Sequence, residues 1–152
     1  MAGVHISLQV GDLEKSAEFY SRFLGDPAKK KPGYVKFVTE DPEIHLALQP
    51  GGGRPEASGS GVLSHLGIRV STPEEVHGWR RRLEASGLSP RIEAQTACCY
   101  ALQEKIWLSD PDGNEWEVYA VLEDLEEAGR CGPGSGCCEG TVQQTSGSLP
   151  AV

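Results

Sequence analysis

Two histidines occupy matching positions in two similar short segments of this sequence. His5 lies in residues 4–10 and His65 in residues 64–70, 60 residues further along the chain. Both segments alternate apolar and polar residues, which is typical of a strand with one buried face. In each segment the histidine shares a face with polar or small residues, opposite the apolar face. We therefore interpret the two segments as copies of an internal repeat.

Glu117 lies on the corresponding face of a later predicted strand, residues 115–122, because it alternates with the apolar Trp116 and Val118. If the two halves curl towards each other, His5, His65 and Glu117 converge. Two histidines and one carboxylate form a facial triad, which suits non-haem Fe(II) and leaves open positions for substrate and dioxygen. Zinc, manganese, nickel or cobalt could occupy the same ligands, since affinity alone does not select iron. Singly, each residue is an ordinary polar residue of a half-exposed strand, and the repeat favours a shared metal.

His45 falls in the first half where Glu117 falls in the second, and its face matches. Two interpretations stay open: a fourth ligand or nearby acid, and a histidine that lines the same cavity without touching metal. His77 lies on the exposed side of a predicted helix and is assigned no role.

Cys98 and Cys99 form an adjacent pair, and the chain has five cysteines in all. An odd number with adjacent pairs is not the spaced pattern of a disulfide framework. The first residues do not read as a secretory signal, so we expect a cytoplasmic, reducing location and free thiols. Neighbouring side chains of a regular strand point to opposite faces, so both thiols can reach one ligand only from a loop or a distorted strand. The alternative is two buried thiols in a core strand.

The elements that position these residues form the same series in each half. Asp12 caps a helix that ends at Gly25, and Thr72 caps a second helix that ends at Gly87. Besides the strands that carry the histidines and Glu117, strands are predicted at residues 34–39, 44–49 and 105–109, with weaker ones near 28–31 and 91–96. Each half is then a strand, a helix and three strands, an α+β arrangement.

The predicted organisation is a first module at residues 1–50, a linker at 51–61, a second module at 62–128 and a flexible Gly- and Cys-rich tail at 129–152. The tail carries Cys131, Cys137 and Cys138, which are either accessory thiols or incidental. A net charge of −8 disfavours binding to nucleic acid or to anionic lipid. The sequence contains no apolar run of about 18 residues that could span a membrane.

Together these residues resemble the vicinal oxygen chelate superfamily, which includes glyoxalases, extradiol dioxygenases and bleomycin and fosfomycin resistance proteins. The resemblance covers about residues 3–122. A narrower similarity, to carbon–arsenic lyases and the cadmium-induced proteins grouped with them, rests on residues 96–107 and 110–117, with support from 10–16 and 32–34. The vicinal cysteine pair is its specific part.

The resemblance implies two βαβββ modules that form a cupped mixed sheet around a metal held by His5, His65 and Glu117. It further implies an Fe(II)- and dioxygen-dependent enzyme that removes methyl or aryl groups from trivalent organoarsenicals and releases arsenite. Cys98 and Cys99 would clamp the soft arsenic through two sulfurs. Tyr100 and Lys105 would position substrate or move protons, although Tyr100 is also compatible with simple packing.

Two alternatives remain: a thiol-based protein that binds arsenic or cadmium, and a glyoxalase-like metalloenzyme in which His45 becomes a ligand. The expected partners are therefore a small-molecule organoarsenical and dioxygen, without nucleic acid or membrane. The chain is expected to be a monomer or a homodimer.

Overall fold

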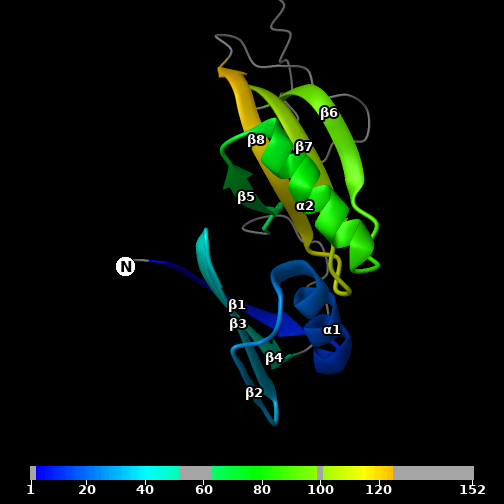
Figure 1. Ribbon diagram of the computed structural model, residues 1–152. Helices are drawn as coiled ribbons and strands as arrows, with labels where there is room; N and C mark the ends of the chain where they lie inside the picture. Colours follow the sequence, from blue (N-terminus) through cyan, green and yellow to red (C-terminus); the bar gives the residue numbers. More distant parts are fainter. Residues whose placement is uncertain (1–2, 52–62, 99–100, 125–152) are drawn as a thin grey trace, which may run out of the picture.

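The computed structural model describes residues 3–51, 63–98 and 101–124 (Figure 1). Most of the predicted linker, the tail with Cys131, Cys137 and Cys138, and also Cys99 and Tyr100 lie outside these ranges. The described chain repeats the series βαβββ. The first copy consists of β1 (Val4–Val10), α1 (Leu13–Leu24), β2 (Lys29–Lys31), β3 (Tyr34–Glu40) and β4 (Glu43–Pro50). The second consists of β5 (Leu66–Val70), α2 (Pro73–Ala85), β6 (Arg91–Cys98), β7 (Ala101–Ser109) and β8 (Glu115–Asp124).

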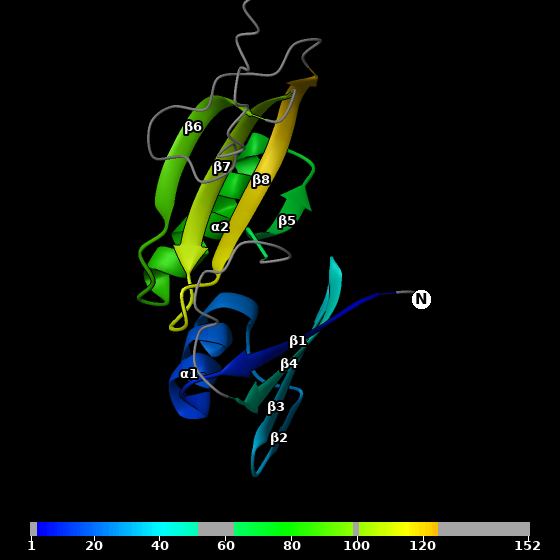
Figure 2. The same cartoon turned by 180° about the vertical axis from the view of Figure 1, so that it is seen from behind.

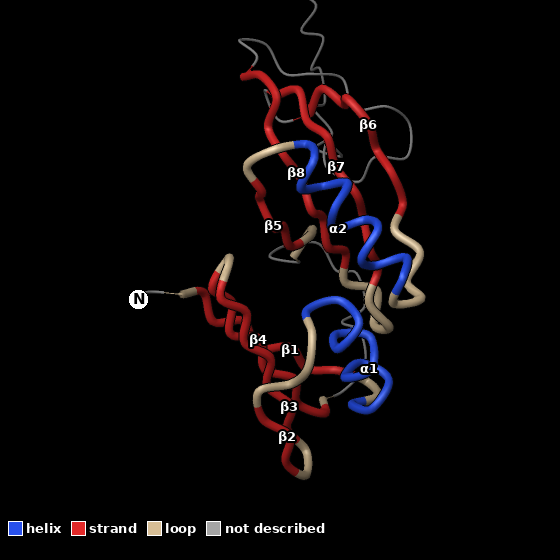
Figure 3. Tube along the Cα trace, viewed as in Figure 1, coloured by secondary structure: helices blue, strands red, loops and turns tan. Residues whose placement is uncertain are grey.

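Each copy forms its own mixed sheet of four strands, in the order β1-β4-β3-β2 and β5-β8-β7-β6 (Figures 2 and 3). In both sheets the first strand runs parallel to the last, and the other neighbours are antiparallel. The predicted α+β class and the two βαβββ modules are confirmed. The strands that precede the helices, β1 and β5, lie at the edges of their sheets.

Local sequence signals account for both helices. Asp12 accepts a hydrogen bond from the Lys15 amide at 3.1 Å, and α1 ends at Gly25, whose φ of 100° favours glycine. At α2, Thr72 accepts from the Glu75 amide at 3.3 Å and Glu75 accepts in return from the Thr72 amide at 3.4 Å. This is the predicted capping box.

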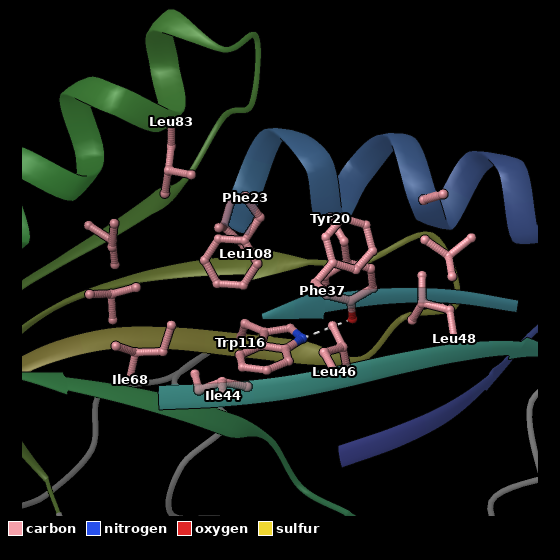
Figure 4. Packing of buried hydrophobic residues seen from close by; sticks show 14 of the residues in the cluster. Tyr20, Phe23, Phe37, Ile44, Leu46, Leu48, Ile68, Leu83, Leu108 and Trp116 are labelled. Carbon is pink, nitrogen blue, oxygen red and sulfur yellow. Dashed lines mark hydrogen bonds between the residues drawn. The ribbon is translucent and has the colours of Figure 1, made fainter. Parts of the chain in front are cut away.

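One hydrophobic core joins the two modules (Figure 4). Phe23 of α1 packs edge-on against Trp116 of β8 and Trp79 of α2, with ring centroids 5.3 and 5.9 Å apart. Near the end of α1, Phe23 is fully buried and Leu24 only partly. The first helix therefore belongs to the core of both modules, a contact that the pattern within one helix cannot reveal.

Several strand boundaries differ from the predictions, and two of the differences concern the strands around the candidate site. The β7 strand begins at Ala101, four residues before its predicted start, and β5 begins at Leu66, so that His65 directly precedes the strand. The β6–β7 ladder also shifts register between Glu93 and Thr96. Among the described residues, neither helix is long and apolar enough to cross a membrane.

Candidate functional site

Glu117 is a buried carboxylate on β8, with 7 % of its surface exposed. It lies directly opposite Gly67 in the parallel β5–β8 ladder. A Cβ atom at position 67 would lie 3.0 Å from Glu117 Oε1 and 3.2 Å from its Cγ. Gly67 therefore leaves the space that the glutamate side chain occupies. Glycine inside a strand pattern often marks such a close approach, and this signal was available in the sequence.

His65 is the nearest histidine to this carboxylate. Its Nε2 lies 3.6 Å from Glu117 Oε1, and its ring packs edge-on against Trp107 with centroids 5.3 Å apart. On the other side of the ring, Nδ1 lies 3.0 Å from Ser64 Oγ. In the tautomer whose Nδ1–H donates to Ser64, the Nε2 lone pair faces Glu117 and is able to accept a metal. Ser64 is thus an orienting residue that the sequence pattern did not single out.

Lys105 supplies a positive charge to the same place. Its side chain is almost completely buried, and its Nζ lies 3.5 Å from Glu117 Oε2 and 5.5 Å from the centre of the Trp107 ring. A buried carboxylate is costly unless it is paired. The two oxygens of Glu117 therefore face different groups, His65 through Oε1 and Lys105 through Oε2.

His5 lies on the other module, exposed on the edge strand β1. Within residues 3–51, 63–98 and 101–124, the structure gathers no set of three His, Cys, Asp or Glu side chains that could hold a metal ion. Of the predicted triad, the structure brings His65 and Glu117 within 3.6 Å of each other, and the role of His5 as third ligand stays a prediction. The strand pairing explains why the sequence pattern could not predict how far His5 lies from His65. β1 pairs with β4 and β5 pairs with β8, so no backbone register relates the two histidines.

His45 is half-buried, and its Nε2 lies 3.0 Å from Glu43 Oε1. It pairs across the ladder with His5. The registers correct its place in the repeat: Glu117 lies opposite Gly67, and the residue opposite the equivalent Ser7 is Ala47. His45 is thus displaced by two residues from the position equivalent to Glu117, although it keeps the same face.

The residues around Glu117 can be compared with the needs of a divalent cation. Two ligands about 2.1 Å from one ion and at right angles to it are roughly 3 Å apart. The observed 3.6 Å between His65 Nε2 and Glu117 Oε1 is close to that value. A neutral imidazole with an orienting hydroxyl and a carboxylate with a cleared space are also suitable ligand chemistry. His65 and Glu117 therefore fit a metal as two of its ligands.

The backbone places Cys98 as the last residue of β6, opposite Ala101 at the start of β7. Further along β7, Trp107 lies opposite Glu117. Six residues of strand separate Ala101 from Trp107, a distance of about 20 Å. The cysteine pair thus begins beside the start of β7, about 20 Å along this strand from the residue opposite Glu117.

A hydrogen-bond network between the modules, buried around Tyr20 and more exposed around Asp112, was not predicted. The Tyr20 hydroxyl of α1 donates to Asp110 Oδ2 at 2.7 Å and accepts from the Trp116 indole N–H at 3.0 Å. Asp112 Oδ1 accepts from the Gly11 amide at 2.9 Å, and its Oδ2 accepts from Ser16 Oγ at 3.3 Å. Burial, and then the Asp110 charge, raise the pKa of Tyr20. A buried tyrosine hydroxyl needs a partner, but the helix pattern does not say which one.

Comparison with known proteins relates this geometry to a family. The model of the Glyoxalase/Bleomycin resistance protein/Dioxygenase superfamily matches residues 4–118. A trivalent organoarsenical cleaving enzyme of Bacillus sp. (strain MD1) is 46 % identical over 129 residues, covering 84 % of this chain and 78 % of that protein. The cadmium-induced protein CadI of Mycobacterium bovis (strain ATCC BAA-935 / AF2122/97) is 42 % identical over 153 residues, covering 93 % and 96 %.

A solved structure shows the same fold. The crystal structure of a glyoxalase/bleomycin resistance protein/dioxygenase from Alicyclobacillus acidocaldarius superposes with a TM-score of 0.65 at 16 % identity, covering 80 % of this chain and 92 % of that one. Members of this superfamily commonly bind divalent metals. The family match spans both sheets and both predicted histidine ligands. This chain belongs to the Glyoxalase/Bleomycin resistance protein/Dioxygenase superfamily.

Proposed function

We propose that this protein is an Fe(II)- and dioxygen-dependent enzyme that cleaves the carbon–arsenic bond of trivalent organoarsenicals and releases arsenite. The observation that carries the proposal is the vicinal pair Cys98-Cys99 in a chain 46 % identical to a trivalent organoarsenical cleaving enzyme. Trivalent arsenic is a soft centre that prefers sulfur ligands. Two neighbouring thiolates are suited to hold it while its organic group stays free to react.

His65 and Glu117 would hold the metal, with His5 as the third ligand. When bound, iron would supply the binding and reduction of dioxygen. Ser64 would keep the imidazole of His65 oriented, because its Oγ lies 3.0 Å from Nδ1. Gly67 would give the Glu117 carboxylate the room that it needs.

Lys105 would act on the substrate side of Glu117. A buried ammonium group can position a substrate through a hydrogen bond or deliver a proton. Tyr100, five residues earlier, would assist in placing the substrate.

The strand geometry sets one requirement for this mechanism. Because Ala101 is about 20 Å along β7 from Trp107, the cysteine pair must bend over the sheet for arsenic to reach the metal. The thiols would thus capture the organoarsenical away from the metal and then carry it to Glu117. Cys131, Cys137 and Cys138 would act as accessory thiols that collect substrate or remove arsenite.

Anaerobic reconstitution with Fe(II), followed by air and a methyl- or arylarsenical in the trivalent state, tests the proposal. We expect arsenite release over many turnovers that requires both iron and dioxygen. Cys98→Ser and Cys99→Ser should abolish release while iron binding persists, and Glu117→Ala should lose iron and release together. His77→Ala, at an exposed histidine on α2, is the matched control for His5→Ala and His65→Ala. Unchanged turnover in both cysteine variants would contradict the clamp.

A second function is favoured by the 42 % identity to the cadmium-induced protein. In that case the thiols would sequester arsenic or cadmium, and the metal held by His65 and Glu117 would be structural. The same assay separates the two functions, because a sequestering protein takes up its ligand stoichiometrically without releasing arsenite from an organoarsenical. A glyoxalase-like reaction would instead survive Cys98→Ser.

A further inference from the structure

We propose that Tyr20 of the first module is a positioning residue for the Glu117 carboxylate of the second. The proposal rests on the proposed function, because it takes Glu117 as a metal ligand. Tyr20 touches no candidate ligand itself. It would act through Trp116, the residue that precedes Glu117 in β8.

The Tyr20 side chain is fixed by packing of its ring and by hydrogen bonds at its hydroxyl. Its ring is fully buried, and it packs against Phe37 and Trp116 with centroids 6.1 and 6.2 Å apart (Figure 4). The hydroxyl donates to Asp110 at 2.7 Å. Asp110 is itself fixed, because its Oδ1 accepts the Asn114 amide at 2.8 Å and its Oδ2 accepts the Asn114 side-chain amide at 2.8 Å. Tyr20 therefore offers the Trp116 indole N–H an acceptor at a defined point.

The bond to Trp116 is made on the opposite face of β8 from Glu117. Successive residues of a strand point to opposite faces, so the depth of the Trp116 indole in the core sets the position of the backbone that carries Glu117. On its own face, Glu117 lies 3.6 Å from His65 Nε2 and 3.5 Å from Lys105 Nζ, and a Cβ at position 67 would lie 3.0 Å from its Oε1. A small shift of β8 would therefore change the distance between His65 Nε2 and the carboxylate.

A second branch of the network links the same strand to β1. Asp112 accepts from the Gly11 amide at 2.9 Å and from Ser16 Oγ at 3.3 Å. Gly11 directly follows β1, the strand that carries His5. The network thus connects the end of β1, which carries His5, to the segment just before β8, which carries Glu117.

A contact elsewhere between the modules provides a matched control. Ser86, the C-cap of α2, has its Oγ 2.8 Å from the Leu83 carbonyl of the same helix and 3.3 Å from the Arg22 carbonyl of α1. This contact joins the two helices at their C-terminal ends and touches neither β1 nor β8. Ser86→Ala removes a hydroxyl-mediated link between the modules without altering the network around Tyr20.

The test measures metal binding by the full chain under anaerobic conditions, with Co(II) alone as the probe. Tyr20→Phe keeps the ring and removes both hydrogen bonds. We expect it to weaken Co(II) binding about tenfold, as loss of groups that orient metal ligands typically does, and to change the Co(II) d–d absorption spectrum. Ser86→Ala should keep the wild-type Kd and spectrum. Wild-type Kd and spectrum in Tyr20→Phe would overturn the proposal.

Two further results complete the test. If wild-type protein binds no Co(II), the metal centre of the proposed function fails, and the positioning role fails with it. If wild type binds and Tyr20→Phe binds equally, the positioning role alone fails. Should Tyr20→Phe not fold, Asp112→Ala replaces it, because it cuts the second branch at a half-buried site. Weaker Co(II) binding there supports the network, and unchanged binding overturns it.

Discussion

The Glu117 side chain has room at its observed position because Gly67, opposite it, has no side chain. Gly67 is the residue opposite it in the ladder, and its lack of a Cβ leaves room for Oε1 and Cγ. The sequence repeat indicates the residue types at the site, a histidine and a glutamate on matching faces. It does not indicate how closely the neighbours enclose them, because that depends on side chains from strands distant in the sequence.

Gly67→Ala should therefore disturb metal binding more than it disturbs the fold. The new methyl group would lie 3.0 Å from Glu117 Oε1, so the carboxylate must shift by a few tenths of an ångström relative to His65. We expect Co(II) affinity to fall roughly 10- to 100-fold, with an overpacking cost of about 1–3 kcal/mol in unfolding free energy. Gly78→Ala in α2 is the control, since a Cβ there meets nothing within 4 Å. It should leave metal affinity unchanged and add about 0.5–1 kcal/mol of stability. Equal metal affinity in both variants would contradict the crowding argument.

Lys105 and a metal both draw on the charge of Glu117. In the metal-free protein, the Lys105 ammonium compensates the buried carboxylate at 3.5 Å. We expect Lys105→Met to lower the stability of the metal-free protein by about 3–5 kcal/mol, because the charge of Glu117 is left without this cation. The same change should tighten Co(II) binding, because the ion no longer competes with a lysine. Thermal unfolding without metal and a Co(II) titration check both parts, and weaker metal binding would refute the competition.

At the scale of elements, the sequence indicates most of the secondary structure, because the signals are local. The Asp12 cap, the capping box at Thr72 and the glycines at 25 and 87 all lie within one turn of the helix ends that they define. The alternation that predicts β1 and β8 is also local. By contrast, the early start of β7 at Ala101 depends on pairing with β6 and β8. The place of His45 in the repeat depends on the strand register. Counting residues along the sequence aligns His45 with Glu117, whereas the ladder pairing aligns Ala47, two residues later, with Glu117.

The α2 capping box stabilises an element without contributing to the site. Thr72 accepts from the Glu75 amide and Glu75 accepts from the Thr72 amide, but neither contacts His65 or Glu117. We expect Thr72→Ala to lower the free energy of unfolding by about 1 kcal/mol, as measured by urea denaturation, while Co(II) affinity stays at the wild-type value. Thr72→Ser should recover most of the loss. A fall in metal affinity with Thr72→Ala would mean that α2 also positions the site.

At the scale of the whole molecule, the two modules form one structure because α1 is shared. Tyr20 and Phe23 pack onto Trp116 (Figure 4). The Tyr20 hydroxyl also donates a hydrogen bond to Asp110. A polar link of this kind is directional, whereas apolar packing alone is not. The sequence cannot predict this link, because residues 110–113, Asp-Pro-Asp-Gly, indicate a turn but do not indicate which part of the protein the turn contacts. The linked modules should therefore unfold together. The protonation of Tyr20 should change the free energy of this shared unfolding transition.

The alkaline dependence of stability follows from the protonation of Tyr20. Burial and the neighbouring Asp110 charge raise the pKa of Tyr20 above its ordinary value of 10.0. Above that pH the unfolded chain releases the Tyr20 proton while the folded chain keeps it. Unfolding is then favoured as pH rises, by at most about 1.4 kcal/mol per pH unit. Below pH 10 this contribution is complete, so the stabilisation by Tyr20 is lost only on the alkaline side.

Comparison of wild type with Tyr20→Phe isolates this effect. Near pH 7, Tyr20→Phe should be less stable by roughly 1–3 kcal/mol, because Asp110 and the Trp116 indole each lose a partner. As the pH rises above 10, the difference between the two proteins should shrink, since phenylalanine has no proton to release. Urea unfolding at a series of pH values measures the difference directly, and Ser86→Ala should differ from wild type by a constant amount throughout. A difference for Tyr20→Phe that stays constant up to pH 11 would show that Tyr20 ionises in the folded protein as readily as in the unfolded chain.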